Sequence, residues 1–205
     1  MGQTEQQPLK RYTVEEFLTL PDDGIRRELI DGIIYIKVEN VDDRPLGMAA
    51  PSLQHQAVSR ELTGQLWQFL KGKSCEVFAS PLAIQLSPDF GVDGTVVEPD
   101  IVVLCNLSKF DKNVYNDIPE FVIEILSPTT ARTDRTVKLQ KYQQSGIKEY
   151  WIVDPIKQLV AVHLLIDGKY KIINYTNKDE SIPVMVLDGC VINIADVFAA
   201  VDRLN

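Results

Sequence analysis

The sequence predicts a single α+β domain, in which a mixed β-sheet is flanked by helices and extended at its edge by β-hairpin strands. Apolar β-formers fill residues 96–104 and 121–126, the pattern of covered strands. A helical segment at 130–145 and a third apolar run at 149–154 follow, which gives a β-β-α-β order. The 205 residues contain no repeat or low-complexity tract, and their 45% hydrophobic content is ample for one core.

The N-terminal residues divide into a polar tail and a first helix. Residues 1–12 predict a flexible tail, so the single domain is expected to span 13–205. Thr13-Val14-Glu15-Glu16 has the Ser/Thr-x-x-Glu order of a capping box. A short helix through Leu20 is therefore expected.

A hairpin and a long helix are predicted next. Arg26–Ile30 and Ile33–Val38 flank Asp31-Gly32, a dipeptide typical of two-residue hairpin turns. Residues 39–52 carry Asp, Arg, Pro, Gly and Ser and predict an irregular loop. From Leu53 to about Lys71, apolar residues recur at three- and four-residue steps, which predicts an amphipathic helix with one stripe on the core.

β-Formers and turn residues define the rest of the chain. They predict strands at 76–79 and 82–86, a loop at 87–95, a hairpin at 159–166 and 169–175, short strands at 183–187 and 190–194, and a closing helix at 195–204. Gly146 is placed to end the helix at 130–145.

Acidic residues outnumber basic ones. Lys and Arg total 21 and Asp and Glu total 29, so the formal net charge is −8. The average field repels phosphate, and any binding to nucleic acid depends on a local basic patch. Residues 129–148 offer such a patch, because they carry five cations and one carboxylate: Arg132, Arg135, Lys138, Lys141 and Lys148 against Asp134.

The three cysteines, Cys75, Cys105 and Cys190, show no CxxC spacing. An odd count without close pairs argues for a reducing compartment and against a disulfide framework or a zinc knuckle. The N-terminus lacks the apolar core of a signal peptide, and no apolar run reaches the roughly 20 residues of a membrane span. We therefore expect a soluble, cytoplasmic protein that does not contact a membrane.

Two carboxylates lie in the apolar runs and need an explanation. Val122, Glu124 and Leu126 share one face of the strand at 121–126, and an unpaired Glu124 would be costly to bury there. If the two runs are neighbours, Asp100 and Glu124 can converge on a divalent cation, since Mg²⁺ prefers one or two carboxylates plus water and a phosphate. The alternative is a glutamate satisfied by a nearby arginine or backbone donor.

The helix at 130–145 adds a basic side chain to these carboxylates. Asp134, Lys138 and Tyr142 recur at four-residue steps and so share one face. Lys138 can reach back over the sheet to hold a phosphate or position an attacking water. The alternative is a solvated helix face with an Asp134–Lys138 ion pair.

Several motifs, in their order along the chain, resemble one family of proteins. They are Arg27–Gly32, Pro51-Ser52-x-x-His55, Glu98-Pro99-Asp100, Glu124–Pro128, the face formed by Asp134, Lys138 and Tyr142, Gly146, and Glu149–Pro155. This spacing, which covers most of the chain, is similar to the Uma-type family of restriction endonuclease-like bacterial proteins within the PD-(D/E)XK nuclease superfamily. The resemblance implies a restriction endonuclease-like mixed sheet flanked by helices, with metal-dependent phosphodiester hydrolysis at one edge.

The sequence departs from the superfamily motif at one position. The motif places a lysine two residues after its acidic residue, but two residues after Glu124 comes Leu126. In the Uma-type pattern the lysine comes from the following helix, where Lys138 matches and Lys141 is the competitor.

The same resemblance implies a role for each candidate site residue. Asp100 and Glu124 are expected to hold Mg²⁺ or Mn²⁺, and Lys138 is expected to orient the attacking water. Glu28 completes or orients the acidic cluster. His55 binds a phosphate or supports a neighbouring site residue, and the alternative for it is a surface or helix-capping histidine.

Nucleic acid, with DNA first, is the substrate that the resemblance implies. A homodimer is expected, because cleavage of both strands needs two sites related by a two-fold axis. The alternative is a catalytically inactive nuclease fold that acts as a binding or scaffolding module, which the acidic charge and the displaced lysine favour. An enzyme acting on RNA or a nucleotide is the remaining possibility, since a fold does not specify a function.

Overall fold

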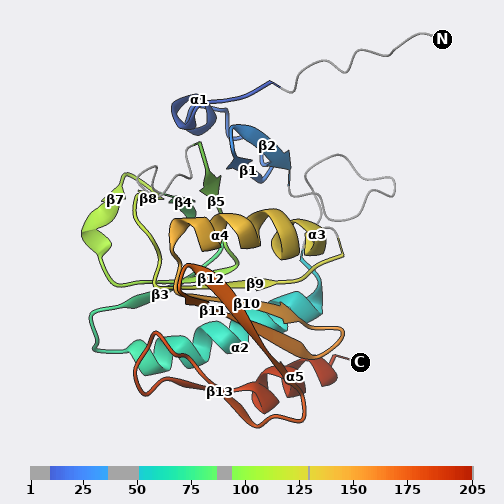
Figure 1. The fold of residues 1–205 in the computed structure, drawn as a ribbon. Helices are drawn as coiled ribbons and strands as arrows, with labels where there is room; N and C mark the ends of the chain where they lie inside the picture. The colour runs from blue at the N-terminus through green and yellow to red at the C-terminus, as the bar shows by residue number, and fades with distance from the viewer. Residues whose placement is uncertain (1–9, 37–50, 87–93, 129, 205) are drawn as a thin grey trace, which may run out of the picture.

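The computed structural model describes residues 10–36, 51–86, 94–128 and 130–204 (Figure 1). In these ranges the strands form two six-stranded mixed sheets and one two-stranded sheet, flanked by helices. The predicted α+β class is confirmed. Within the same ranges no helix is long and apolar enough to cross a lipid bilayer.

The larger strands form a sheet that we call the central sheet. Its spatial order is β12 (Lys169–Thr176), β11 (Leu159–Ile166), β10 (Glu149–Asp154), β9 (Phe121–Ile125), β6 (Ile101–Leu104) and β3 (Glu76–Ala79). Strands β9 and β10 are parallel, and the other neighbours are antiparallel. Parallel neighbours need a crossover connection, which a helical segment supplies here. The predicted edge hairpin is confirmed as β11 and β12.

Two helices cover one face of the central sheet. They are α2 (Leu53–Leu70) and α5 (Ile194–Asp202), which lie side by side below the sheet in Figure 1. Their buried apolar residues share one core with inward-facing residues of β6, β9 and β10. Helix α2 begins where the Ser52 side chain accepts a hydrogen bond from the backbone of His55, at 3.1 Å. This cap holds His55 in the first turn.

The second six-stranded sheet is called the N-terminal sheet here. Its spatial order is β2 (Ile33–Ile36), β1 (Arg27–Ile30), β5 (Val96–Val97), β4 (Ala83–Gln85), β8 (Val114–Tyr115) and β7 (Phe110–Asp111). The predicted hairpin around Asp31-Gly32 is confirmed as β1 and β2, although its last two predicted residues, 37 and 38, lie outside the described residues. A second core joins this sheet to the other face of the central sheet.

The crossover between β9 and β10 is a helix in three parts. They are α3 (Ala131–Thr133), the π-helical turn η3 (Asp134–Lys138) and α4 (Leu139–Ser145), and Figure 1 shows α4 between the two sheets. The predicted helix is confirmed, but the π turn within it was not predicted. The helix ends at Gly146, whose φ of 84° lies in the left-handed region that glycine tolerates.

Smaller elements complete the chain. The predicted capping box is confirmed before α1 (Val14–Leu18), since Thr13 and Glu16 exchange hydrogen bonds of 2.8 and 3.1 Å. The predicted strand at 183–187 is wrong, because β13 (Ser181–Pro183) pairs with β14 (Val191–Asn193) and a turn closed by the bond from Val184 N to Cys190 O lies between them. The short strands β7 and β8 and a 3₁₀ turn at Leu107–Lys109 were not predicted.

Three predicted irregular segments extend beyond the described ranges. Residues 1–9 of the tail, 39–50 of the first loop and 87–93 of the second loop lie outside the described residues. The described parts of these segments adjoin α1, α2 and β5.

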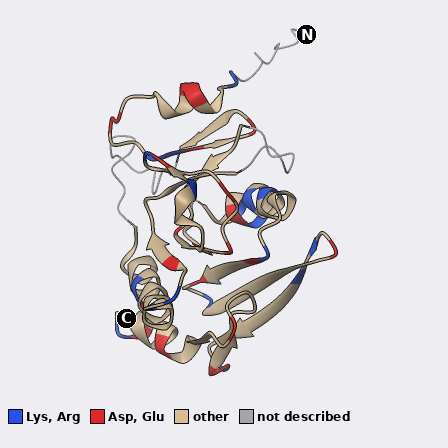
Figure 2. Cartoon of the chain, turned by 90° about the vertical axis from the view of Figure 1, so that its left-hand side faces the viewer, with Lys and Arg blue, Asp and Glu red and all other residues tan. Residues whose placement is uncertain are grey.

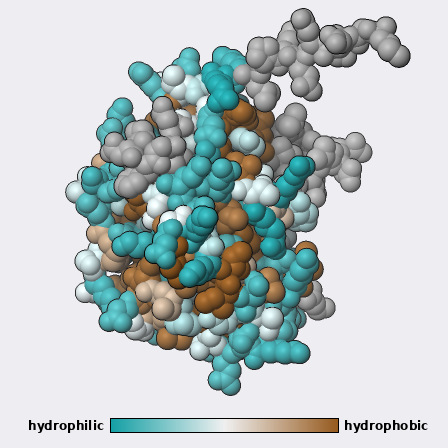
Figure 3. Space-filling model, viewed as in Figure 1, coloured by the Kyte–Doolittle hydropathy of each residue, from teal (hydrophilic) through white to brown (hydrophobic). Residues whose placement is uncertain are grey.

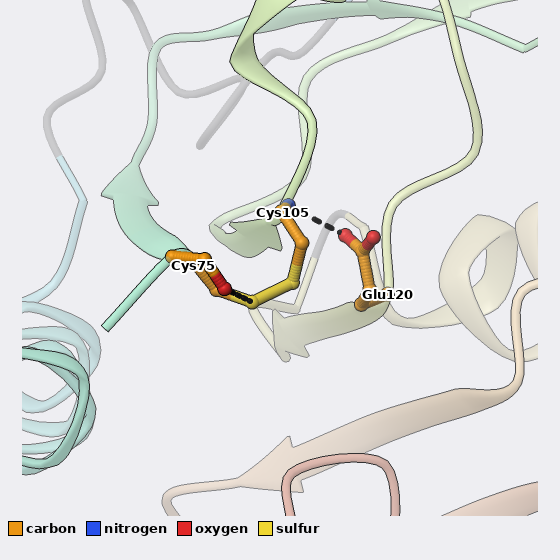
Figure 4. The surroundings of a disulfide bond; sticks show 4 residues. Cys75, Cys105 and Glu120 are labelled. Atoms are coloured by element: carbon orange, nitrogen blue, oxygen red, sulfur yellow. Dashed lines mark hydrogen bonds between the residues drawn. A yellow bond between two sulfur atoms is a disulfide. The ribbon is translucent and has the colours of Figure 1, made fainter.

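The expectation of unpaired cysteines is wrong. Cys75 and Cys105 form a disulfide, drawn in Figure 4, and Cys190 is a buried free thiol. Strands β3 and β6 pair Glu76 with Leu104, so the next position outward places the two cysteines opposite each other. The 30-residue separation of the cysteines gives no hint of this register. The disulfide therefore ties together the ends of two neighbouring strands.

Candidate active site

The register of β6 and β9 places Asp100 and Glu124 together. Ile101 and Ile123 form the last pair of this antiparallel ladder, and Asp100 and Glu124 are the next residue of each chain segment beyond that pair. The carboxylate of Asp100 also accepts a hydrogen bond of 2.8 Å from the backbone N–H of Ile125, which fixes its direction.

Glu28, from strand β1 of the N-terminal sheet, contacts the same lysine as Glu124. Its side chain is buried, and its Oε1 atom accepts hydrogen bonds from the backbone N–H of Glu98 at 2.8 Å and from Lys138 Nζ at 3.0 Å. Glu98 itself pairs with Arg26 at 3.1 Å. The two sheets and the crossover helix therefore meet at Glu28.

Lys138 is the centre of the cluster. Its side chain is 1% exposed, and its Nζ atom lies 2.5 Å from Glu124 Oε1, 3.0 Å from Glu28 Oε1 and 3.7 Å from Asp134 Oδ1. Burial lowers the pKa of Lys138, but the three neighbouring carboxylates, that of Glu124 first, raise it well above its ordinary value. Lys138 is therefore a buried cation held by acidic side chains.

Lys141, the competing lysine, points elsewhere. Its Nζ atom lies 2.6 Å from Asp31 Oδ1 in the turn between β1 and β2, and it donates a hydrogen bond of 3.3 Å to Gln144. The two lysines thus have different partners in the structure, although they are only three positions apart in sequence. Lys138 is the one placed among the strand carboxylates.

Two tyrosines donate hydrogen bonds to residues of the cluster. The Tyr142 hydroxyl donates a hydrogen bond of 2.8 Å to Glu124 Oε1, and the Tyr150 hydroxyl donates one of 3.2 Å to the backbone oxygen of Asp134. Burial, followed by the nearby Glu124 charge, raises the pKa of both hydroxyls well above its ordinary value. Both tyrosines therefore act as hydrogen-bond donors. The contact between Tyr142 and Glu124 was not predicted, and the four-residue spacing from Lys138 was its only sequence signal.

His55 contacts Asp100 from the first turn of α2. Its Nε2 atom is 3.3 Å from Asp100 Oδ2, and the ring is largely buried. Of the two roles expected for His55, this contact favours support of a neighbouring site residue. Together with the bond from Ile125, it holds the Asp100 carboxylate in place.

The basic segment is mostly engaged with carboxylates. Figure 2 shows basic and acidic positions side by side on the crossover helix. Arg135 lies 3.4 Å from Asp154, Lys141 pairs with Asp31, and Lys138 is buried. Much of the local positive charge predicted from sequence is thus balanced within the fold.

The donor set matches the chemistry of a hard divalent cation, which takes oxygen ligands. The carboxylates of Glu28, Glu124 and Asp134 lie around the ammonium of Lys138, and that of Asp100 is hydrogen-bonded to Ile125, the residue after Glu124. The buried Oδ2 atom of Asp134 has no hydrogen-bond partner among the described residues. Across the described ranges, no three His, Cys, Asp or Glu side chains are already arranged as a metal site. The residues fit a metal by type and charge, with Lys138 in the space between them.

Comparisons with known proteins agree with this architecture. A family model described as "Uma2: Putative restriction endonuclease" matches residues 14–195. An uncharacterized protein of Synechocystis sp. strain PCC 6803 is 26% identical over 175 residues, which is 84% of each chain. The crystal structure of a "putative nuclease" from Anabaena variabilis has a TM-score of 0.71 at 23% identity and covers 92% of this chain and 98% of its own. This last likeness establishes a shared fold.

Proposed function

Because the chain belongs to the Uma2 family, described as "putative restriction endonuclease", we propose that it hydrolyses phosphodiester bonds of nucleic acid, with DNA as the first substrate, in a reaction that depends on Mg²⁺ or Mn²⁺. The observation that carries the proposal is the burial of Lys138 against Glu124, with the Asp100 carboxylate hydrogen-bonded to the backbone N–H of Ile125, the residue after Glu124. An acid pair with a lysine beside it supplies the groups that metal-dependent hydrolysis requires.

Each residue of the cluster has a distinct proposed role. Asp100 and Glu124 would hold the metal, which when bound supplies Lewis acidity and lowers the pKa of a coordinated water. Lys138 would donate hydrogen bonds to the attacking water and to the charge that develops on the phosphate. Glu28 holds the ammonium of Lys138, and His55 steadies Asp100.

A second candidate function is a nuclease-fold protein that binds or scaffolds without cutting. The observation that favours it is electrostatic, since the net charge is −8 and Arg135 and Lys141 are paired with carboxylates. Nucleic acid would then meet few uncompensated cations on the crossover helix. RNA or a nucleotide remains an alternative substrate class for the enzyme.

The proposal also covers the domain organisation and the assembly of the protein. We propose one restriction endonuclease-like domain at 13–205, preceded by a tail at 1–12, and a homodimer as the working assembly. A cytoplasmic location is also proposed, although the disulfide between Cys75 and Cys105 removes the argument based on unpaired cysteines.

A nicking assay on supercoiled plasmid tests this function, with Lys141→Ala as the matched control for Lys138→Ala. Wild type should nick only with Mg²⁺ or Mn²⁺, and Lys138→Ala should lose activity by about 100-fold or more, the scale of one lost electrostatic stabiliser. Lys141→Ala should stay within a few-fold of wild type, because its partner is Asp31. Thermal unfolding of each variant establishes that it is folded.

Two outcomes would contradict the proposal. If Lys138→Ala nicks as fast as wild type, the lysine is wrongly assigned. If wild type cuts neither DNA nor RNA with either metal, the binding or scaffolding function replaces the enzyme.

A further inference from the structure

Carboxylates outnumber ammonium groups around Lys138. Glu124 and Glu28 contact its ammonium at 2.5 and 3.0 Å, Asp134 lies at 3.7 Å, and the Asp100 carboxylate accepts a hydrogen bond from the N–H of Ile125, next to Glu124. Buried carboxylates repel each other unless a cation lies among them. In this arrangement the ammonium of Lys138 is that cation.

A divalent metal requires the same oxygen atoms. Mg²⁺ binds carboxylate oxygens at about 2.0–2.1 Å and demands nearly octahedral geometry. With Lys138 Nζ already 2.5 Å from Glu124 Oε1, a metal on that oxygen would lie within a few ångströms of the ammonium. Repulsion between two cations at about 4 Å is strong where water is excluded. Metal and ammonium therefore compete for Glu124.

The local backbone is suited to a change of lysine position. Lys138 ends the π turn η3, which also contains Asp134, and such turns often mark functional positions in helices. The Asp134 Oδ2 atom is buried without a hydrogen-bond partner among the described residues, so it is a nearby acceptor for a displaced ammonium. Lys138 can thus leave Glu124 without leaving the cluster.

We propose that Lys138 is a built-in counter-cation that occupies the carboxylate cluster before metal binding and is displaced from Glu124 when a divalent metal binds. This inference rests on the proposed function, because it assigns a cation exchange to the same site. It gives Lys138 two tasks, which are to keep the acidic cluster stable without metal and to become available for water and phosphate once the metal is bound.

Removing the charge of Lys138 should strengthen metal binding, whereas loss of a residue that merely supports the site would weaken it. Lys138→Met keeps the length of the side chain but removes the charge, so the carboxylates lose their internal competitor. The variant should bind Mn²⁺ at least tenfold more tightly than wild type. Lys141→Met is the matched control, because it removes a lysine three residues away that pairs with Asp31.

Isothermal titration calorimetry with MnCl₂ at one pH, together with thermal unfolding in EDTA and in Mn²⁺, tests the exchange. We expect tighter binding and a large Mn²⁺-induced rise in Tm for Lys138→Met, with a small rise for wild type and for Lys141→Met. If Lys138→Met folds only when Mn²⁺ is present, the same conclusion follows. If it folds under neither condition, Lys138→Gln, which keeps one donor, is titrated with the same expectation.

The possible failures are distinguishable. If wild type binds Mn²⁺ and the folded Lys138 variant binds no more tightly, the counter-cation role is overturned while the metal site stands. If neither wild type nor the variant binds Mn²⁺ or Mg²⁺, this inference and the proposed metal-dependent function fail together.

Discussion

At the residue scale, the main feature is a lysine inside the protein that remains charged. An ammonium removed from water is costly unless its partners are close and well placed, and Lys138 has Glu124 and Glu28 as such partners. Tyr142 adds a donor to Glu124, so the acidic side of the pair is also satisfied. Each member of the cluster thus depends on another for its charge state.

The buried histidine outside the site gives a prediction about pH. His163 lies in β11 beside the Tyr150 ring, its Nδ1 atom is 3.2 and 3.1 Å from the backbone oxygens of Tyr150 and Ala161, and burial lowers its pKa below the ordinary 6.5. As the pH falls through 6.5, the unfolded chain takes up a proton at His163 that the folded protein refuses. The contribution of His163 to the free energy of unfolding is therefore present above pH 6.5 and is lost as the pH falls below 6.5.

The substitution His163→Gln removes the titrating imidazole, so comparison with wild type isolates the contribution of His163. Urea unfolding of both proteins at about pH 7.5 and about pH 5.5 should show a smaller loss of unfolding free energy for the variant than for wild type. Other titrating groups are common to both proteins, so they cancel in the comparison. Parallel pH dependence in the two proteins would show that His163 does not contribute.

At the element scale, periodic segments could be predicted from sequence and short ones could not. Helix α2 and strands β10, β11 and β12 carry long, regular apolar patterns, and the structure has them within one or two residues of their predicted bounds. Strands β7 and β8 have two residues each, so their pairing is set by tertiary contacts. The π turn could not be predicted, because a π turn adds only one residue to a helical turn and leaves the spacing of polar and apolar residues close to that of an α-helix.

Strand β12 provides the element-scale prediction, which concerns the homodimer. It lies at the edge of the central sheet, and Ile172 and Ile173 at its middle are 56% and 44% exposed. Figure 3 shows hydrophobic side chains gathered near the middle of the face that carries this strand. Exposed edge strands are templates for pairing with a second chain.

Antiparallel pairing of two β12 strands about the point between Ile172 and Ile173 is compatible with their charges. It places Lys171 opposite Asn174 of the second copy, so no lysine faces a lysine. Light scattering should report a dimer for wild type and a monomer for Ile172→Lys. The control is Ile166→Lys, which changes an exposed residue at the end of β11. A monomeric wild type at high micromolar concentration would exclude this dimer.

At the scale of the whole molecule, the site assembles from parts that are distant in sequence. Glu28 comes from the N-terminal sheet, Asp100 and Glu124 come from the central sheet, and Lys138, 110 residues after Glu28, comes from the crossover helix. His55 is added from the helix layer on the other face of the central sheet. The fold brings these residues together by stacking the two sheets around the crossover helix.

This assembly explains how far sequence reasoning could reach. The pairing of β6 with β9 could be anticipated, because two apolar runs with one carboxylate each suggest neighbouring strands. The run at 96–104 is not one strand, however, since it forms β5 and β6 in different sheets, with Asp100 between them. Glu28 could be named only through the family resemblance, since nothing in a local pattern places one sheet against another. The disulfide was missed for the same reason, because it depends on the register between β3 and β6.

The most direct test of the central claim is the position of a bound metal. Anomalous diffraction from a crystal of the wild-type protein soaked in Mn²⁺ should show a peak between the carboxylates of Asp100 and Glu124. In the same crystal, Lys138 Nζ should have moved away from Glu124. The same soak of an Asp100→Asn, Glu124→Gln variant should lose that peak. A fully soaked wild-type crystal with no peak at these carboxylates, or with its metal bound elsewhere, would contradict the account.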